Sequence, residues 1–142
     1  MTKMMNLRKL MMSDRDCGRL RETLRRAKAE NRVSPHTLEA LENEIAKAMI
    51  FPPDEIPRYL VTMNTSVRVK DLKTATTLEF TLVYPEEEDL PSGKVSVLSD
   101  IGSAVLGFTV GDTVEWAFPD GMHDLRIEMI TYQPEATHNY ES

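Results

Sequence analysis

The chain has 142 residues, 41 % of them hydrophobic and 28 % charged, with a formal net charge of −6. These values are typical of one globular domain or two small ones and argue against a disordered chain. The acidic balance disfavours free duplex DNA as the main ligand. No apolar run approaches the roughly 18 residues of a membrane span, and residues 1–6 lack the apolar core of a signal peptide. The single cysteine excludes an internal disulfide and fits the cytoplasm, so we expect a cytoplasmic protein with no membrane partner.

The first third of the chain predicts two helices. Ser13 is a helix N-cap candidate with acidic residues behind it, and Ser34 followed by Pro35 starts a second helix. Apolar residues then recur alternately three and four positions apart, at Cys17, Leu20, Leu24 and Ala27 and at Leu38, Leu41, Ile45 and Ala48. This spacing predicts a short antiparallel coiled-coil hairpin of two helices, each of roughly 17 residues and about 25 Å.

After residue 51 the pattern changes from helix to strand. Three prolines in residues 51–57 end the second helix and stiffen a linker. Apolar and polar residues then alternate in 67–70, 78–84, 114–118 and 125–129, and residues 99–108 have room for a short helix. We therefore predict an α+β protein with a helical hairpin (1–51), a linker (52–60) and a small antiparallel-sheet domain carrying one helix (61–142).

Charge differs between the two parts. Residues 1–56 hold 11 basic and 9 acidic side chains, whereas residues 57–142 hold 6 basic and 14 acidic ones. The asymmetry indicates two surfaces with different partners.

Four short motifs in the sheet domain carry a family resemblance. They are residues 61–67 (VTMNTSV), 99–107 (SxIGxAxLG), 110–112 (VGD) and 119–121 (PxG). In this order and spacing they resemble the C-terminal domain of the Gre transcription elongation factors. The resemblance implies a fold like the FK506-binding proteins and a role on bacterial RNA polymerase, whose secondary channel the helical hairpins of Gre factors enter.

The hairpin differs from that of the cleavage-competent Gre factors. Theirs is longer and carries a pair of acidic residues at its tip, which helps to hold a metal ion in the polymerase active site. The tip here is Glu30, Asn31, Arg32 and Val33, with one carboxylate. The short hairpin, together with residues 61–64 (VTMN) and 82–85 (LVYP), is similar to the subgroup named for the regulator of nucleoside diphosphate kinase.

The resemblance implies a non-enzymatic regulator without a cofactor or a metal of its own. We expect it to dock as a monomer on the rim of the secondary channel and to compete with Gre cleavage factors. The implied polymerase contact is the loop Ser99, Asp100, Ile101 and Gly102, although Ser99 also fits the N-cap of the short helix.

Basic residues of the first helix form a stripe along one face. Arg21, Arg25, Lys28 and Arg32 follow helical spacing. The stripe either faces RNA or an acidic polymerase surface, or it pairs with Glu39, Glu42 and Glu44 of the second helix. A weak RNA or DNA contact within the complex would show a steep dependence on salt.

Two other functions stay open at this point. One is a transcript-cleavage factor that uses Glu30 on backtracked polymerase, and the other is a prolyl isomerase or chaperone suggested by the sheet-domain fold alone.

The remaining features of the sequence are explained by structural roles. Cys17 and Trp116 are expected in the core, the three histidines form no metal site, and the acidic run 86–89 is a solvated loop.

Overall fold

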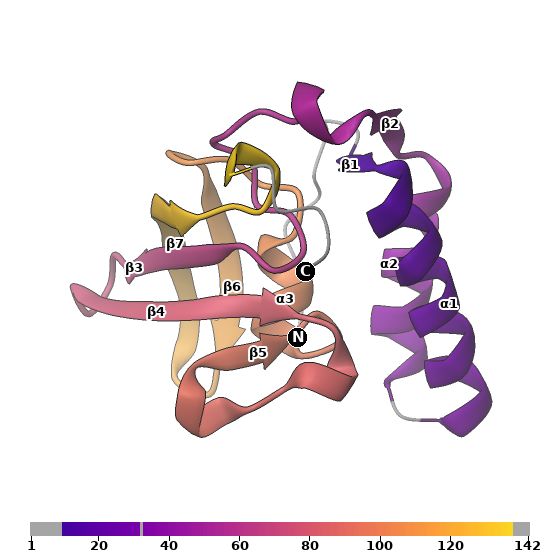
Figure 1. Cartoon of the computed structure of the whole chain (residues 1–142). Helices are drawn as coiled ribbons and strands as arrows, with labels where there is room; N and C mark the ends of the chain where they lie inside the picture. The colour runs from indigo at the N-terminus through magenta and orange to yellow at the C-terminus, as the bar shows by residue number, and fades with distance from the viewer. Residues whose placement is uncertain (1–9, 32, 138–142) are drawn as a thin grey trace.

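The computed structural model describes residues 10–31 and 33–137. It contains a pair of helices, α1 (Asp14–Glu30) and α2 (Pro35–Ala46), beside a five-stranded sheet (Figure 1). No helix within the described ranges is long and apolar enough to cross a membrane.

The two helices form where their capping residues predict. The Ser13 hydroxyl accepts the Asp16 backbone N–H, and the Ser34 hydroxyl accepts the Thr37 N–H. The residues buried along the two helices are Cys17, Leu20, Leu24, Ala27, Leu38, Leu41 and Ile45. The predicted apolar seam is therefore present. α2 has 12 residues rather than about 17, because the chain turns into a strand after Lys47.

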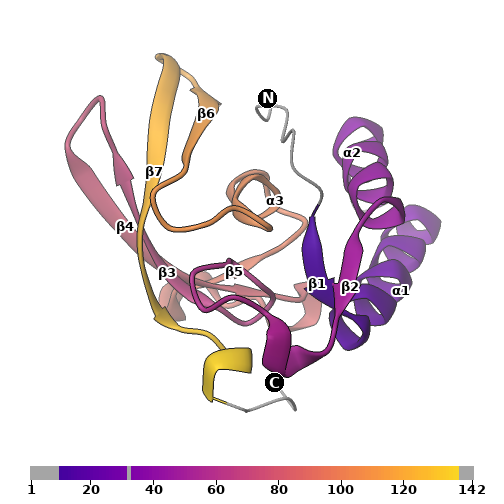
Figure 2. The same ribbon diagram turned by 90° about the horizontal axis from the view of Figure 1, so that it is seen from above.

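A short parallel strand pair closes one end of the helix pair. β1 (Met11–Ser13) leads into α1 and pairs with β2 (Met49–Phe51), which follows α2. The start of α1 and the end of α2 therefore lie at the same end of the pair. Three-residue strands carry no readable alternation, so the sequence did not predict them. Leu10 and Met12 are buried, and their segment lies between the helix pair and the sheet domain (Figure 2).

The sheet of the larger part is mixed. Its strands are β3 (Ser66–Asp71), β4 (Thr76–Val83), β5 (Lys94–Ser96), β6 (Thr113–Phe118) and β7 (Gly121–Tyr132). Their order is β5-β4-β3-β7-β6, and all neighbours are antiparallel except β4 and β5. The prediction of an antiparallel sheet was therefore wrong at β5. The loop 84–93, with its two 3-10 turns, returns the chain so that β5 runs alongside β4 in the same direction.

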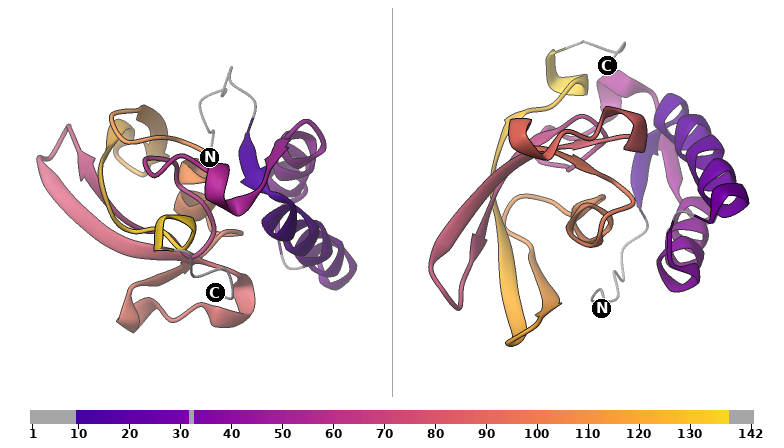
Figure 3. Two further views of the ribbon diagram at one scale, coloured as in Figure 1. Left: turned by 45° about the horizontal axis from the view of Figure 1, so that its top comes forward. Right: turned by 90° about the horizontal axis from the view of Figure 1, so that it is seen from below.

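The core lies between the sheet and α3 (Asp100–Val105), around which the sheet curves (Figure 3). The buried strand residues are Val67, Val69, Phe80, Leu82, Val114, Trp116, Leu125 and Ile127. The alternation in 78–84 and 125–129 predicts that Leu78 and Met129 join them, but they are 47 % and 44 % exposed. Leu78 lies in the exposed first half of β4. At Met129 a register shift between β3 and β7 breaks the alternation, so that Ile130 and not Met129 packs on the core. The buried residues of this core and of the helix seam form one continuous cluster.

Candidate functional site

The loop before α3 is built around a capping serine. The Ser99 hydroxyl donates to the Ser96 carbonyl at 2.6 Å and accepts the Gly102 N–H at 3.1 Å. The Ser96 hydroxyl in turn accepts the Leu98 N–H. A serine that caps its own helix in this way fixes the conformation of the loop. The residues around it therefore form an ordered surface.

The four predicted contact residues differ in what they expose. Gly102 is buried, and a Cβ there would collide with the Ser96 carbonyl oxygen, so this position packs α3 against the end of β5. Ser99 and Ile101 are half-buried. The backbone of Asp100 begins α3, while its side chain lies outside what the structure describes. A polymerase contact at this loop stays a prediction.

At the tip of the helix pair the chain turns within four residues. Glu30 ends α1 and is exposed, and Asn31 adopts a left-handed conformation with φ of 57°. Its N–H binds the carbonyls of the last helical turn. Val33 is half-buried against the core, and Arg32 lies outside the described residues. Glu30 is thus the one carboxylate among the described tip residues.

The described residues of the basic stripe lie on an exposed face of α1. Arg21, Arg25 and Lys28 are exposed and, with Leu24 and Ile45 beneath, line a cavity of about 360 Å³. Arg25 binds Glu22 of its own helix through two hydrogen bonds of 2.6 and 2.9 Å. Glu42 of α2 lines the same cavity, so the alternative in which the stripe pairs with Glu39, Glu42 and Glu44 stays a prediction.

The junction between α1 and the sheet domain contains a buried tyrosine. Tyr84 is fully buried, and its hydroxyl donates to Asp16 at 3.2 Å. Burial raises the pKa of Asp16 to about 6, and the nearby Glu135 carboxylate adds to the rise, whereas the Tyr84 hydrogen bond opposes it. Glu135 is buried as well and accepts the Thr62 hydroxyl at 2.8 Å. This junction therefore brings two carboxyl groups together away from water.

Arg19 adds a cation to the same junction. Its guanidinium lies 3.8 Å from the centre of the Tyr84 ring and 3.5 and 3.6 Å from carboxylate oxygens of Glu86 and Glu87. Glu88 accepts the Ser96 N–H at 3.3 Å. The run 86–89, expected to be a solvated loop, is thus exposed but engaged in contacts. Residues 84 and 19 are 65 positions apart, so no local pattern could reveal the contact.

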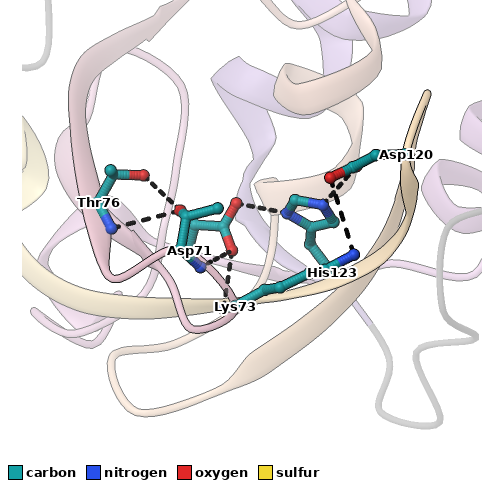
Figure 4. A network of polar contacts seen from close by, with 6 residues as sticks. Asp71, Lys73, Thr76, Asp120 and His123 are labelled. Atoms are coloured by element: carbon teal, nitrogen blue, oxygen red, sulfur yellow. Dashed lines mark hydrogen bonds and ion pairs between the residues drawn. The ribbon is translucent and has the colours of Figure 1, made fainter.

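A second polar cluster joins two strand turns on the side of the sheet away from the helix pair (Figure 4). His123 Nδ1 lies 2.6 Å from Asp71, and its Nε2 lies 2.7 Å from Asp120. These bonds raise the pKa of His123 and lower the pKa of both aspartates. Lys73 approaches Asp120 at 3.7 Å. With both ring nitrogens occupied, His123 ties the β3–β4 and β6–β7 turns together.

Comparison with known proteins identifies the family of the chain. The family described as transcription elongation factor GreA/GreB, C-terminal, matches residues 57–132. The chain belongs to this GreA/GreB family. The match spans the sheet domain from the linker to the end of β7, and it includes Tyr84, the acidic run and the loop before α3. α1 and α2 precede it.

Individual relatives agree with this assignment. The regulator of nucleoside diphosphate kinase from Escherichia coli (strain K12) is 36 % identical over 103 residues, which cover 72 % of this chain and 76 % of that protein. Transcription elongation factor GreA from Chlorobium phaeobacteroides is 38 % identical over 105 residues, 73 % of this chain and 65 % of that protein. Both resemblances seen in the sequence are thereby confirmed.

A solved structure of a GreA/GreB transcription elongation factor from Nitrosomonas europaea aligns with a TM-score of 0.74 and 38 % identity. The alignment covers 88 % of this chain and 99 % of that one, so it extends beyond the 76 residues of the Gre family match. Among residues 10–31 and 33–137, no group of three His, Cys, Asp or Glu side chains is placed to hold a metal ion.

Proposed function

We propose that this chain is a transcription regulator that binds bacterial RNA polymerase at the rim of the secondary channel. The sheet domain docks through the loop 99–102, and the helix pair points into the channel without promoting transcript cleavage. It competes there with Gre cleavage factors. The chain acts as a cytoplasmic monomer without a cofactor, and any RNA or DNA contact is a weak one within the complex.

The length and the tip of the helix pair carry this proposal. The longer helix, α1, has 17 residues, which at 1.5 Å per residue is about 26 Å. Cleavage-type Gre factors have a longer hairpin that ends in an acidic pair. Here the described tip offers Glu30 alone, and a hard divalent cation needs several oxygen ligands. An arm of this kind occupies the channel but supplies little to the chemistry of cleavage.

Competition on stalled elongation complexes tests the proposal. A cleavage-type Gre factor is added at a sub-saturating concentration, this protein is titrated in, and RNA products are followed on a gel. We expect cleavage to fall as this protein rises. Unchanged cleavage at large excess, together with no binding to core polymerase at micromolar concentration, overturns the proposal.

A matched pair of charge reversals locates the docking surface. Asp100→Lys changes the predicted contact loop, whereas Asp54→Lys changes an exposed carboxylate of the linker. We expect Asp100→Lys to weaken competition and Asp54→Lys to leave it unchanged. Equal effects of the two variants would show that net charge, and not the loop, governs binding.

The second candidate is a cleavage factor, and the exposed position of Glu30 at the end of α1 favours it. This function predicts that the protein alone cleaves RNA in stalled complexes and that Glu30→Ala abolishes the activity. Cleavage by the wild type with that dependence would replace the competitor proposal.

A further inference from the structure

The contact between α1 and the acidic run after β4 is the starting point. Tyr84 is held from two sides by α1, because Asp16 accepts its hydroxyl while Arg19, one turn later, lies over its ring. Arg19 also reaches Glu86 and Glu87. Isolated ion pairs of this exposure contribute little, but here one guanidinium joins an aromatic ring and two carboxylates. The contact therefore acts as a unit.

The same acidic run continues to the loop before α3. Glu88 accepts the Ser96 N–H, and the Ser96 carbonyl accepts the hydroxyl of Ser99, the N-cap of α3. The Ser96 carbonyl also lies against Gly102. A continuous series of contacts thus runs from Arg19 on α1 to the loop 99–102.

A cavity of about 300 Å³ lies beside this series of contacts, between α1 and the sheet domain. Its lining includes Arg19, Glu30, Pro85, Glu86 and Leu98. Apolar packing fixes neighbouring elements because close-packed side chains resist displacement. The continuous apolar cluster joins the helix pair to the sheet domain through Leu10 and Met12. Most residues that line the cavity are polar or charged, so there the polar contacts of Arg19 add to the apolar ones in setting the angle of the helix.

We propose that Arg19, Tyr84 and residues 86–88 form a bracket that positions the helix pair relative to the loop 99–102. The bracket is a positioning device. It keeps the arm at one angle to the sheet domain and ties that angle to the loop through Glu88 and Ser96. Its use on polymerase rests on the proposed function, whereas its effect on the shape of the free protein does not.

The distance between two spin labels tests the bracket in the free, full-length chain. Asn43→Cys on α2 and Thr77→Cys on β4 are exposed sites for the labels, and Cys17→Ala removes the native thiol. We expect one narrow distance distribution by pulsed electron paramagnetic resonance. Arg19→Gln and the double variant Glu86→Gln/Glu87→Gln should broaden it. An unbroadened distribution in both overturns the proposal.

Two controls separate the bracket from a general loss of charge or of fold. Asp54→Asn/Glu55→Gln removes the same charge from an exposed acidic pair in the linker and should leave the distribution narrow. Glu86 and Glu87 have side chains 58 % and 43 % exposed, so their neutral variant should fold normally. Broadening by the linker variant to the same extent would count against the bracket.

Amide exchange gives an independent measurement at the far end of the bracket. The Ser96 N–H donates to Glu88. We expect Glu88→Ala, which removes the acceptor, to speed its exchange about fivefold, because even a small loss of local stability changes the open population by such a factor. An unchanged rate removes Glu88 from the bracket. Failure of the competition assay would overturn the proposed function and leave both of these results standing.

Discussion

The helix pair makes two contacts of opposite character. Within the pair, apolar side chains such as Leu20 and Leu41 meet along a regular seam. Toward the sheet domain the apolar cluster continues, and beside it Asp16 and Arg19 meet Tyr84 and the acidic run. Burial of apolar area does not depend on protonation or screening, but the second contact depends on both. The seam within the helix pair should therefore be insensitive to pH and salt, whereas the polar contact with the sheet domain should respond to both.

The largest effect should come from truncating the seam. Leu20 is 1 % exposed, and Leu20→Ala should lower the free energy of unfolding by about 2–5 kcal/mol, since it removes apolar contact and leaves a cavity. Urea unfolding at pH 5 and pH 8 should give the same loss. A loss confined to one pH would show that the seam and the junction are not separate. A comparable loss in the exposed-site control Leu78→Ala would show that burial of Leu20 is not the cause.

Asp16→Asn should change how stability depends on pH. The pKa of Asp16 in the folded protein is raised from 3.8 to about 6. Protonation of Asp16 therefore contributes to the free energy of unfolding. This contribution is fully present below about pH 4 and is lost as the pH rises through 6, a change of about 2–3 kcal/mol. Asparagine is neutral throughout, so the variant should gain on the wild type by this amount between pH 4 and pH 8.

Urea unfolding at several pH values measures this difference, and Asp14→Asn, an exposed carboxylate in the same turn, is the control. The charged and titratable groups around Asp16 are Glu135 from the C-terminal turn, Tyr84 from the end of β4, and Arg15 and Arg19 from α1. Parallel pH profiles for wild type and Asp16→Asn would mean that Asp16 is hydrated in solution.

The two contacts also differ in how far the sequence predicted them. The seam follows from local spacing, and so do the caps at Ser13 and Ser34, because a helix turns its own neighbours to one face. The junction joins Asp16 to a tyrosine 68 positions away, and pairing at such separation leaves no periodic signal. The parallel placement of β5 depends likewise on how a loop folds back. The contact at loop 99–102 was predicted from family motifs, not from its chemistry, and stays a prediction.

A smaller change is expected at the second polar cluster, which is independent of the helix pair. His123 has a raised pKa, so the stability from its charge is present below pH 6.5 and is lost as the pH rises through the raised value. The lowered pKa of Asp71 acts oppositely, with stability present above pH 3.8 and lost as the pH falls through the lowered value. Asp120, 63 % exposed, is screened by solvent.

His123→Gln should therefore lower the melting temperature most between pH 3.8 and pH 6.5. Below and above this range the melting temperature of the variant should depend less on pH than that of the wild type. Melting curves from pH 3 to pH 9 measure this, and the double variant with Asp16→Asn should show additive effects, since distant sites without shared partners behave independently. Coupling between the two variants would mean that the junction and the strand turns respond to pH as one unit.

The smallest effect on stability should come from the basic stripe, where function and fold can be separated most cleanly. Arg25 and Arg26 both bind Glu22, and their side chains are 69 % and 65 % exposed, but only Arg25 lies on the stripe. Neither Arg25→Gln nor Arg26→Gln should measurably change the melting temperature. If the stripe faces RNA or an acidic polymerase surface, Arg25→Gln should weaken competition and reduce its dependence on salt, whereas Arg26→Gln should do neither. Equal behaviour of the two variants in that assay would leave the stripe as an ordinary solvated helix face.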